Sequence, residues 1–376
     1  MTSARAPRVA VIGAGPGGLT CARILQTHGR SVTVFERETS PDARPQGGTL
    51  DMHADTGQAA LRAAGLLDRF RALARPEGQE WRTLDHATAD VVRHGRPDGG
   101  EDDRPEIDRG QLRGLLLESL DPGTVRWGRT LSAVTPLGGG ACRLTFADGT
   151  AEDFDLAVGA DGAWSRVRPA LSDAVPGYTG VTFVEAGFDD ADTRHTGIAR
   201  LVGDGTMLAK CGTRALFGQR NSNGHIRVYV AFRAPVDWHE TAGLDLGDTA
   251  AVRAHLLKMF DGWDESLRDL LRDNDGGFVN RPLFALPVPH TWEHVPGVTL
   301  LGDAAHLMPP LGLGANLAML DGTELARALV AEPGVDDAVR AYESVMLPRS
   351  TEAAAACAQG LANLIPPDGP AATGRR

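Results

Sequence analysis

The first 36 residues constrain the fold more than any other part of the sequence. An apolar run at 8–12 leads into a glycine-rich corner, and apolar side chains then recur at helical spacing over 19–28. A β-branched run at 31–35 follows and ends at Glu36. A strand, a helix and a second strand in this order predict a βαβ unit, and therefore a parallel sheet that is covered by helices.

The glycine-rich corner, GAGPGG, matches the spacing G-x-G-x-x-G at Gly13, Gly15 and Gly18. These glycines permit a tight turn, close approach of a pyrophosphate, and tight packing of a helix on a strand. The N-terminus of the following helix favours the negative charge of the phosphates. Glu36 follows about 20 residues later, where a carboxylate accepts hydrogen bonds from a ribose. The segment therefore predicts a dinucleotide site.

Two more corners combine a strand end, an acidic residue and glycines. GADGAWSRVR, at 159–168, places Asp161-Gly162 between an apolar run and a basic segment. LLGDAAHLMPPLGLGANLAML, at 300–320, places Asp303 after a glycine and then turns through a Pro-Pro pair into an apolar helix. Each corner alone fits an ordinary loop. The three together are hard to assign to chance.

Size and composition narrow the class of protein. A chain of 376 residues with 42% hydrophobic residues fits a globular protein of two lobes. The net charge of −11 argues against a nucleic-acid binder. Four widely spaced cysteines show no zinc spacing, so we expect no metal site. No apolar run reaches the length of a membrane span, and we expect a cytoplasmic protein.

A second lobe is indicated by short alternating runs over 178–232, separated by Asp, Gly and Asn turns. This pattern predicts an antiparallel sheet. We therefore predict a discontinuous first domain made of 1–177 and 281–335. The second domain spans 178–280, and a C-terminal helix and tail occupy 336–376.

With these corners in this order, the chain resembles the FAD-dependent aromatic hydroxylases, the flavoprotein monooxygenases related to p-hydroxybenzoate hydroxylase. Three stretches resemble more closely the tetracycline-inactivating TetX-type monooxygenases: GGTLDMHADTGQAALRAAGLL (47–67), PEIDRGQLRGLLLESL (105–120) and LGDAAHLMPP (301–310). The resemblance implies an α/β fold. It consists of a Rossmann-like FAD-binding domain with a parallel sheet, a substrate domain built on an antiparallel sheet, and C-terminal helices.

The resemblance also implies residues that contact the cofactor. Gly13, Gly15 and Gly18 would hold the FAD pyrophosphate and Glu36 the adenosine ribose, with Arg37 near the adenine. Arg109 and Arg113 would reach FAD from one helix face. Asp161 and Gly162 would support both FAD and the nicotinamide cofactor. Asp303 would accept hydrogen bonds from the ribityl chain, and backbone N–H groups of Gly314, Ala315 and Asn316 would face the pyrimidine edge of the flavin.

Matching by position to the TetX-type enzymes implies a substrate pocket of Glu185, Thr206, Phe217, Arg227 and Leu311, with Met308 as core or pocket wall. The sequence departs from the pattern at Thr206 and Arg227, where those enzymes carry arginine and histidine. The turn before Gly314 is one residue shorter and has Leu313 in place of glutamine. We interpret His306 and Trp164 as packing residues.

The activity that the resemblance implies is hydroxylation. NADPH or NADH would reduce FAD, and O₂ would add at the flavin C4a to give a hydroperoxide that hydroxylates a polycyclic aromatic or tetracycline-like molecule. Because the flavin carries this chemistry, no catalytic residue is assigned. Two alternatives stay open: a dehydrogenase or reductase of the same fold in antibiotic biosynthesis, and a non-catalytic FAD protein that sequesters a drug. The expected partner is an aromatic or polyketide small molecule, and we expect a monomer or a weak dimer.

Overall fold

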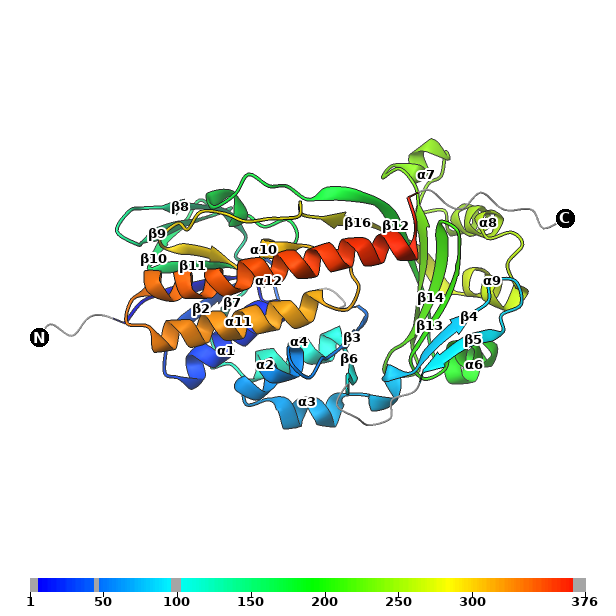
Figure 1. The fold of residues 1–376 in the computed structure, drawn as a ribbon, viewed down its shortest axis with the longest axis horizontal. Helices are drawn as coiled ribbons and strands as arrows, with labels where there is room; N and C mark the ends of the chain where they lie inside the picture. Colours follow the sequence, from blue (N-terminus) through cyan, green and yellow to red (C-terminus); the bar gives the residue numbers. More distant parts are fainter. Residues whose placement is uncertain (1–5, 44–46, 96–102, 368–376) are drawn as a thin grey trace, which may run out of the picture.

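The computed structural model describes residues 6–43, 47–95 and 103–367. The outer ends of the predicted first and C-terminal domains therefore lie outside the described residues. Figure 1 shows two lobes side by side, with the long helix α12 (Val335–Leu364) running across the first lobe and ending against the sheet of the second.

The first lobe is built on a parallel sheet of five strands in the order β17-β11-β1-β2-β7. All four residues of its central strand are buried, as expected for a strand that is covered on both faces. The strands are β1 (Val9–Ile12), β2 (Val32–Phe35), β7 (Val125–Arg126), β11 (Leu156–Gly159) and β17 (Val298–Leu300).

Helices and two small antiparallel sheets complete this lobe. Helix α1 packs against α11, which also contacts α2 and α12. The helices are α1 (Pro16–Thr27), α2 (Gly57–Ala63), α3 (Leu67–Leu73), α4 (Arg109–Glu118), α10 (Asp303–His306) and α11 (Gly314–Ala331), with 3-10 turns η1 (Pro76–Gln79) and η2 (Arg168–Ala170). The small sheets pair β3 (Thr49–Asp51) with β6 (Glu106–Asp108), and join β8 (Leu131–Pro136), β9 (Cys142–Phe146) and β10 (Ala151–Phe154).

The second lobe is built on a seven-stranded sheet in the order β16-β12-β15-β14-β13-β4-β5. Every pair of neighbours is antiparallel except β13 and β4, which are parallel. The strands are β4 (Trp81–Leu84), β5 (Val91–Gly95), β12 (Gly177–Phe188), β13 (Thr206–Cys211), β14 (Arg214–Arg220), β15 (Ile226–Arg233) and β16 (Asp275–Ala285).

The two faces of this sheet have different neighbours. One face packs in a buried cluster with helices that include α6, α8 and α9. The opposite face packs with Leu361 and Ile365 at the end of α12, and so is turned toward the first lobe. The helices of the lobe are α5 (Ala191–Arg194), α6 (Thr196–Val202), α7 (Trp238–Thr241), α8 (Thr249–Met259) and α9 (Glu265–Arg272).

The predicted α/β fold, with a parallel sheet and a largely antiparallel second sheet, is confirmed. One assignment differs in detail, because β4 and β5, at 81–95, lie in the second sheet although they precede residue 178. Their run was too short and too polar to reveal a strand pairing more than 100 residues away.

Within the described residues, no helix combines the length and apolarity needed to cross a membrane.

Candidate functional site

The three glycine-bearing corners meet at one edge of the parallel sheet. Strands β17, β11 and β1 are neighbours and run in the same direction, so the turns that follow them lie together. A Cβ atom on Gly13 would lie 2.3 Å from the Ala160 carbonyl oxygen of the second corner. A Cβ atom on Gly17 would lie 2.6 Å from the Ala318 carbonyl oxygen in α11. The folded chain therefore brings the three corners together.

The first corner has the shape that a pyrophosphate requires. Gly13 has φ +109°, a conformation that residues with side chains rarely adopt, and a Cβ on Gly18 would lie 2.4 Å from the Gly13 carbonyl oxygen. Gly15, in contrast, faces open space and precedes α1 without a side-chain cap. The open side of Gly15 and the free N–H groups of the helix N-terminus thus fit a phosphate group.

Glu36 and Arg113 hold this corner from two sides. The Glu36 carboxylate is buried, and its Oε2 accepts a hydrogen bond from the Ala14 backbone N–H at 2.8 Å. Arg113, also buried, donates from Nε to the Ala14 carbonyl at 3.0 Å and forms an ion pair with Glu38 at 3.0 Å. Arg113 therefore supports the corner through its backbone, while Arg109 is half-buried and Arg37 is exposed. Their direct contacts with FAD stay predictions.

The second corner is linked to the third by a buried arginine that the sequence reasoning did not single out. Asp161 accepts hydrogen bonds from Ser165 Oγ and from the Arg166 backbone N–H, both at 2.6 Å. Burial raises the pKa of the Asp161 carboxyl, and these hydrogen bonds oppose the shift. Arg168 donates from Nε to the Ala304 carbonyl at 2.8 Å and from Nη2 to the Asp303 carbonyl at 3.2 Å. The sequence could have indicated this residue, because Arg168 is the last residue of the motif GADGAWSRVR.

The third corner offers a carboxylate and free backbone N–H groups. Asp303 is exposed, and one of its oxygens lies 3.8 Å from the Cβ position of Gly314. Helix α11 begins at Gly314 after Leu313, which provides no side-chain cap. The first N–H groups of an α-helix have no partner within the helix, so those of Gly314, Ala315 and Asn316 suit an electron-rich ring edge.

The prediction for Asn316 concerned only its backbone N–H group, but its side chain also forms hydrogen bonds. Its Oδ1 accepts hydrogen bonds from the backbone N–H groups of His53 and Gly57, at 3.0 and 3.1 Å. Its Nδ2 donates to the carbonyl oxygens of Asp51 and Gly312, at 2.7 and 3.0 Å. One buried amide thus joins the start of α11 to the segment after β3.

His306 forms a buried ion pair in the third corner. Its Nε2 lies 2.6 Å from Asp321 Oδ2, which also accepts the Gly302 backbone N–H at 3.0 Å. Burial lowers the pKa of His306, but the charge and hydrogen bond of Asp321 outweigh burial and raise the pKa overall. Arg349 donates to the other Asp321 oxygen at 2.8 Å. This arrangement fits the interpretation of His306 as a structural residue that fixes the Gly302-Asp303 turn.

The predicted pocket residues of the second lobe share one face of its sheet. Strand pairing brings Arg227 opposite Gly187, Tyr229 opposite Glu185 and Phe217 opposite both Tyr229 and Leu208. Arg227 and Arg281 both form ion pairs with Glu185, the latter at 3.2 Å. Thr206, at the end of this face, is buried and accepts a hydrogen bond from Gln219 at 3.4 Å.

Leu311 packs against the cluster that contains Met308, but the two residues differ in burial. Leu311 contacts the cluster that contains Phe217 on the sheet face, and it directly precedes the Gly312 turn. Met308 is buried with Leu317 and Cys357 between α11 and α12. Of the two alternatives, core or pocket wall, this position fits the core.

Three aromatic side chains form a group on the same face, and two of them were missed. The Phe183 ring centroid lies 6.0 Å from that of Phe217 and 5.7 Å from that of Tyr229. Two-residue alternation from Glu185 and Arg227 places Phe183 and Tyr229 on the predicted pocket face, so strand alternation in the sequence could have identified them.

Trp164, interpreted as a packing residue, is 60% exposed and makes an edge contact with Phe284 at 5.1 Å. Because this loop residue lies over β16 instead of inside the lobe, most of its indole stays in solvent.

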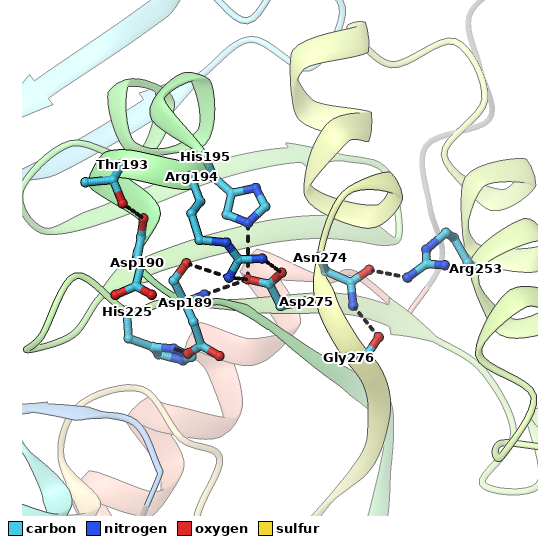
Figure 2. Close-up of polar contacts among 10 residues, drawn as sticks. All are labelled: Asp189, Asp190, Thr193, Arg194, His195, His225, Arg253, Asn274, Asp275 and Gly276. Carbon is cyan, nitrogen blue, oxygen red and sulfur yellow. Dashed lines mark hydrogen bonds and ion pairs between the residues drawn. The ribbon is translucent and has the colours of Figure 1, made fainter.

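A second polar cluster lies at the ends of β12 and β16 (Figure 2). The Asp275 carboxylate accepts hydrogen bonds from the Asp189 backbone N–H at 2.8 Å, from Arg194 at 3.0 Å and from His195 at 3.1 Å. The Asp189 hydrogen bond is the largest cause of the lowered pKa of Asp275. These contacts clamp the loop before α5, and among the described residues no group of His, Cys, Asp and Glu side chains is arranged to hold a metal ion.

Comparison with known proteins decides the family. The family model described as "FAD binding domain" matches residues 7–241 and 291–356, which include all three corners. The chain belongs to this FAD-binding family. A monooxygenase of Penicillium thymicola, penA, is 32% identical over 415 residues, covering 94% of each chain. The 3-amino-4-hydroxybenzoate 2-monooxygenase of Streptomyces cremeus is 32% identical over 389 residues, covering 98% of this chain and 90% of the relative.

A solved structure extends the comparison to the fold. The tetracycline destructase Tet(55) superposes with a TM-score of 0.73 at 19% identity, covering 99% of this chain and 93% of the other. The predicted resemblance to FAD-dependent hydroxylases and to TetX-type enzymes is thereby confirmed. The protein is an FAD-dependent monooxygenase, and such a reaction uses O₂ and a reduced nicotinamide as electron donor. The open Gly15 surface and the uncapped N-terminus of α11 fit this cofactor.

Proposed function

We propose that this FAD-dependent monooxygenase hydroxylates an aromatic or polycyclic phenol-like small molecule, with tetracycline-type compounds and aromatic polyketides as the leading class. The observation that carries the proposal is the group of Phe183, Phe217 and Tyr229, which lies on the sheet face turned toward the first lobe. Aromatic side chains provide flat apolar walls that suit the ring of such a substrate.

The proposal assigns different tasks to the two lobes. The glycine corner and Glu36 bind the adenosine half of FAD, while Asp303 and the first N–H groups of α11 orient its flavin half. When bound, the flavin supplies the electron transfer and oxygen activation that no side chain can provide. The half-buried aromatic face positions the substrate and keeps water from the reacting atoms.

Electrostatics at the lobe junction support the same site. Glu185 is flanked by Arg227 and Arg281, so this cluster carries two cations for one carboxylate. Burial raises the pKa of Tyr229, and the positive charge of Arg227 partly opposes that shift. Together with the N-terminal dipole of α11, this excess of positive charge favours an anionic flavin or a phenolate substrate.

Turnover of candidate substrates tests the proposal. The FAD-loaded protein is given NADPH or NADH, isotope-labelled O₂ and a phenolic polycycle. Substrate-stimulated oxidation of the nicotinamide with one labelled oxygen in the product supports hydroxylation. Turnover without labelled oxygen supports a dehydrogenase or reductase instead. Tight binding of tested compounds without any turnover supports a sequestering protein.

A further inference from the structure

Helix α12 contains one glycine, Gly360, which follows an alanine-rich stretch and lies about one turn before the helix ends. Glycine is a poorer helix former than alanine, so local helix formation does not account for its presence. A Cβ atom at this position would lie 2.6 Å from the Cδ1 atom of Leu311. The glycine therefore leaves room for the Leu311 side chain against α12.

Leu311 connects α12 with both parts of the proposed reaction site. It belongs to the third corner and directly precedes the Gly312 turn. It packs against the buried cluster that contains Leu361 of α12, and Phe217 of the aromatic group packs against the same cluster. The Leu311 side chain thus lies where the third corner, the end of α12 and the aromatic sheet face of the second lobe meet (Figure 1).

The end of α12 is held in place by cations of the second lobe. Lys210 Nζ, on β13, donates to the Asn363 carbonyl oxygen at 3.3 Å. Arg233, on β15, donates from Nη2 to the Ile365 carbonyl at 2.9 Å and from Nε to the Pro366 carbonyl at 3.1 Å. The last carbonyl groups of a helix have no partner within it, and positive charge stabilises that end. Helix α12 therefore cannot move back from the third corner without losing these contacts.

The backbone on both sides of the Leu311 side chain is fixed as well. The Leu311 N–H donates to the Pro309 carbonyl at 2.9 Å, and the Gly312 carbonyl accepts the Asn316 amide at 3.0 Å. Asn316 is buried and bonded to the segment after β3. Because the colliding atom is the end of a flexible side chain, a methyl group added at Gly360 rotates that side chain and leaves both backbones in place.

We propose that Gly360 is a specificity-determining position: it keeps Leu311 against α12 and thereby sets how wide a ring system fits between the third corner and the aromatic group. The inference rests on the proposed function, which takes the sheet face of Phe183 and Phe217 as a wall of the substrate site. Leu311 is half-buried, so a side chain that is pushed away from α12 moves toward its open side and narrows that site. Gly360 acts through Leu311 and is a positioning residue.

Two phenols of different width measure the space beside Leu311. Calorimetric titration of the FAD-loaded protein gives Kd for 2-naphthol, which has two fused rings, and for 2-hydroxyanthracene, which has three. The variants are Gly360→Ala and the double variant Gly360→Ala/Leu311→Val. Gly197→Ala, on α6, is the matched control, because a Cβ atom added at this helical glycine meets no described atom.

Gly360→Ala should raise the Kd of the three-ring phenol about tenfold, the effect of a surplus methyl group in a packed site, and that of the two-ring phenol less than about twofold. The double variant should return the three-ring Kd to within about threefold of the parent, because valine gives the space back. Gly197→Ala should change neither Kd. The affinity of Gly360→Ala for FAD should match that of the parent, which separates a narrowed site from a weakened fold. Equal losses for both phenols, no loss for either, or no recovery in the double variant would overturn the proposal.

A parent protein that binds neither phenol would contradict the proposed function instead. The crystal structure of Gly360→Ala then decides the inference without any ligand. A rotated Leu311 side chain, with α12 and the Gly312 turn in their places, supports it, and a displaced α12 beside an unmoved Leu311 overturns it.

Discussion

Arg168 Nε donates to the Ala304 carbonyl oxygen at 2.8 Å, and this contact joins two corners that are 136 residues apart in the sequence. The same guanidinium donates to the Ala163 carbonyl at 2.8 Å within its own corner. A side chain that is 3% exposed thus fixes the distance between the Asp161 turn and the Asp303 turn. The carboxylate of Asp303 can serve a cofactor only if this distance is kept.

Substitution of Arg168 by methionine should therefore weaken FAD binding without touching the cofactor directly. Loss of the guanidinium leaves buried carbonyl groups without a donor, which costs about 2–4 kcal/mol of folding stability. We expect the Kd for FAD to rise about tenfold, as measured by quenching of flavin fluorescence. The exposed neighbour Arg166 provides the control, since Arg166→Met keeps the backbone contacts of the turn. Equal FAD affinity in both variants would contradict the role of Arg168.

Asn316→Ala should loosen the segment that follows β3. The variant removes two accepted backbone hydrogen bonds from His53 and Gly57 and two donated ones. Because these groups are at least partly buried, we expect the free energy of unfolding to fall by about 2–4 kcal/mol, measured by urea denaturation of the FAD-loaded protein. Asn363→Ala, at an exposed position near the end of α12, should change it by less than about 0.5 kcal/mol.

Glu106 should make stability depend on pH. Burial raises the pKa of this carboxyl to about 7, while a hydrogen bond from Thr49 opposes the shift. A folded-state pKa above the unfolded value means that the folded protein retains a proton that the unfolded chain releases. The contribution is present below the ordinary carboxyl pKa of 4.5 and is lost as the pH rises to about 7. The loss amounts to about 3 kcal/mol of unfolding free energy.

Urea denaturation at a series of pH values measures this effect. Glu106→Gln imitates the protonated carboxyl, so its unfolding free energy should fall less than that of the parent over the same pH window. Glu118→Gln, an exposed carboxyl on α4, should reproduce the parent curve. Parallel curves for the parent and Glu106→Gln would show that Glu106 does not titrate in this range.

Asp321→Asn should reveal a structural and not a catalytic role of the His306 pair. Burial opposes the charge on Asp321, yet the charge of His306 lowers its pKa, while the pKa of His306 is raised. The pair therefore contributes stability between these two pKa values. That contribution is lost as the pH falls through the lowered pKa of Asp321 or rises through the raised pKa of His306. Breaking the buried pair should cost about 3–5 kcal/mol.

Kinetics distinguish the two roles of this pair. If it is structural, the pH profile of turnover per bound FAD should keep its shape in Asp321→Asn, although less protein is folded. A shift of that profile would assign His306 to the reaction itself.

The sequence predicted the parts of the site that depend on local pattern. Strand, glycine turn and helix form a local signal, so the first corner with Gly13, Gly15 and Glu36 could be predicted from spacing. The roles of the second and third corners were implied by the family resemblance. The parallel sheet followed from the βαβ unit. Strand alternation also contained Tyr229, two residues after the predicted Arg227.

Contacts between distant segments could not be predicted in this way. The pairing of β4 with β13 joins residues that are more than 100 positions apart, and no periodicity encodes such a partner. The amide of Asn316 and the guanidinium of Arg168 act on backbone groups that only the folded chain brings near them. Side-chain type alone does not identify such partners.

The most direct test of the account is the affinity of the protein for FAD when the third corner loses its carboxylate. Asp303→Ala removes an exposed carboxylate, whereas Glu332→Ala removes an exposed one just beyond α11. Loss of one or two charge-assisted hydrogen bonds to the ribityl chain predicts a Kd for FAD that is about 10-fold to 100-fold higher in Asp303→Ala. Glu332→Ala should match the parent. A parent protein that binds no FAD, or an Asp303→Ala variant that binds it as tightly as the parent, would contradict the assignment of this site.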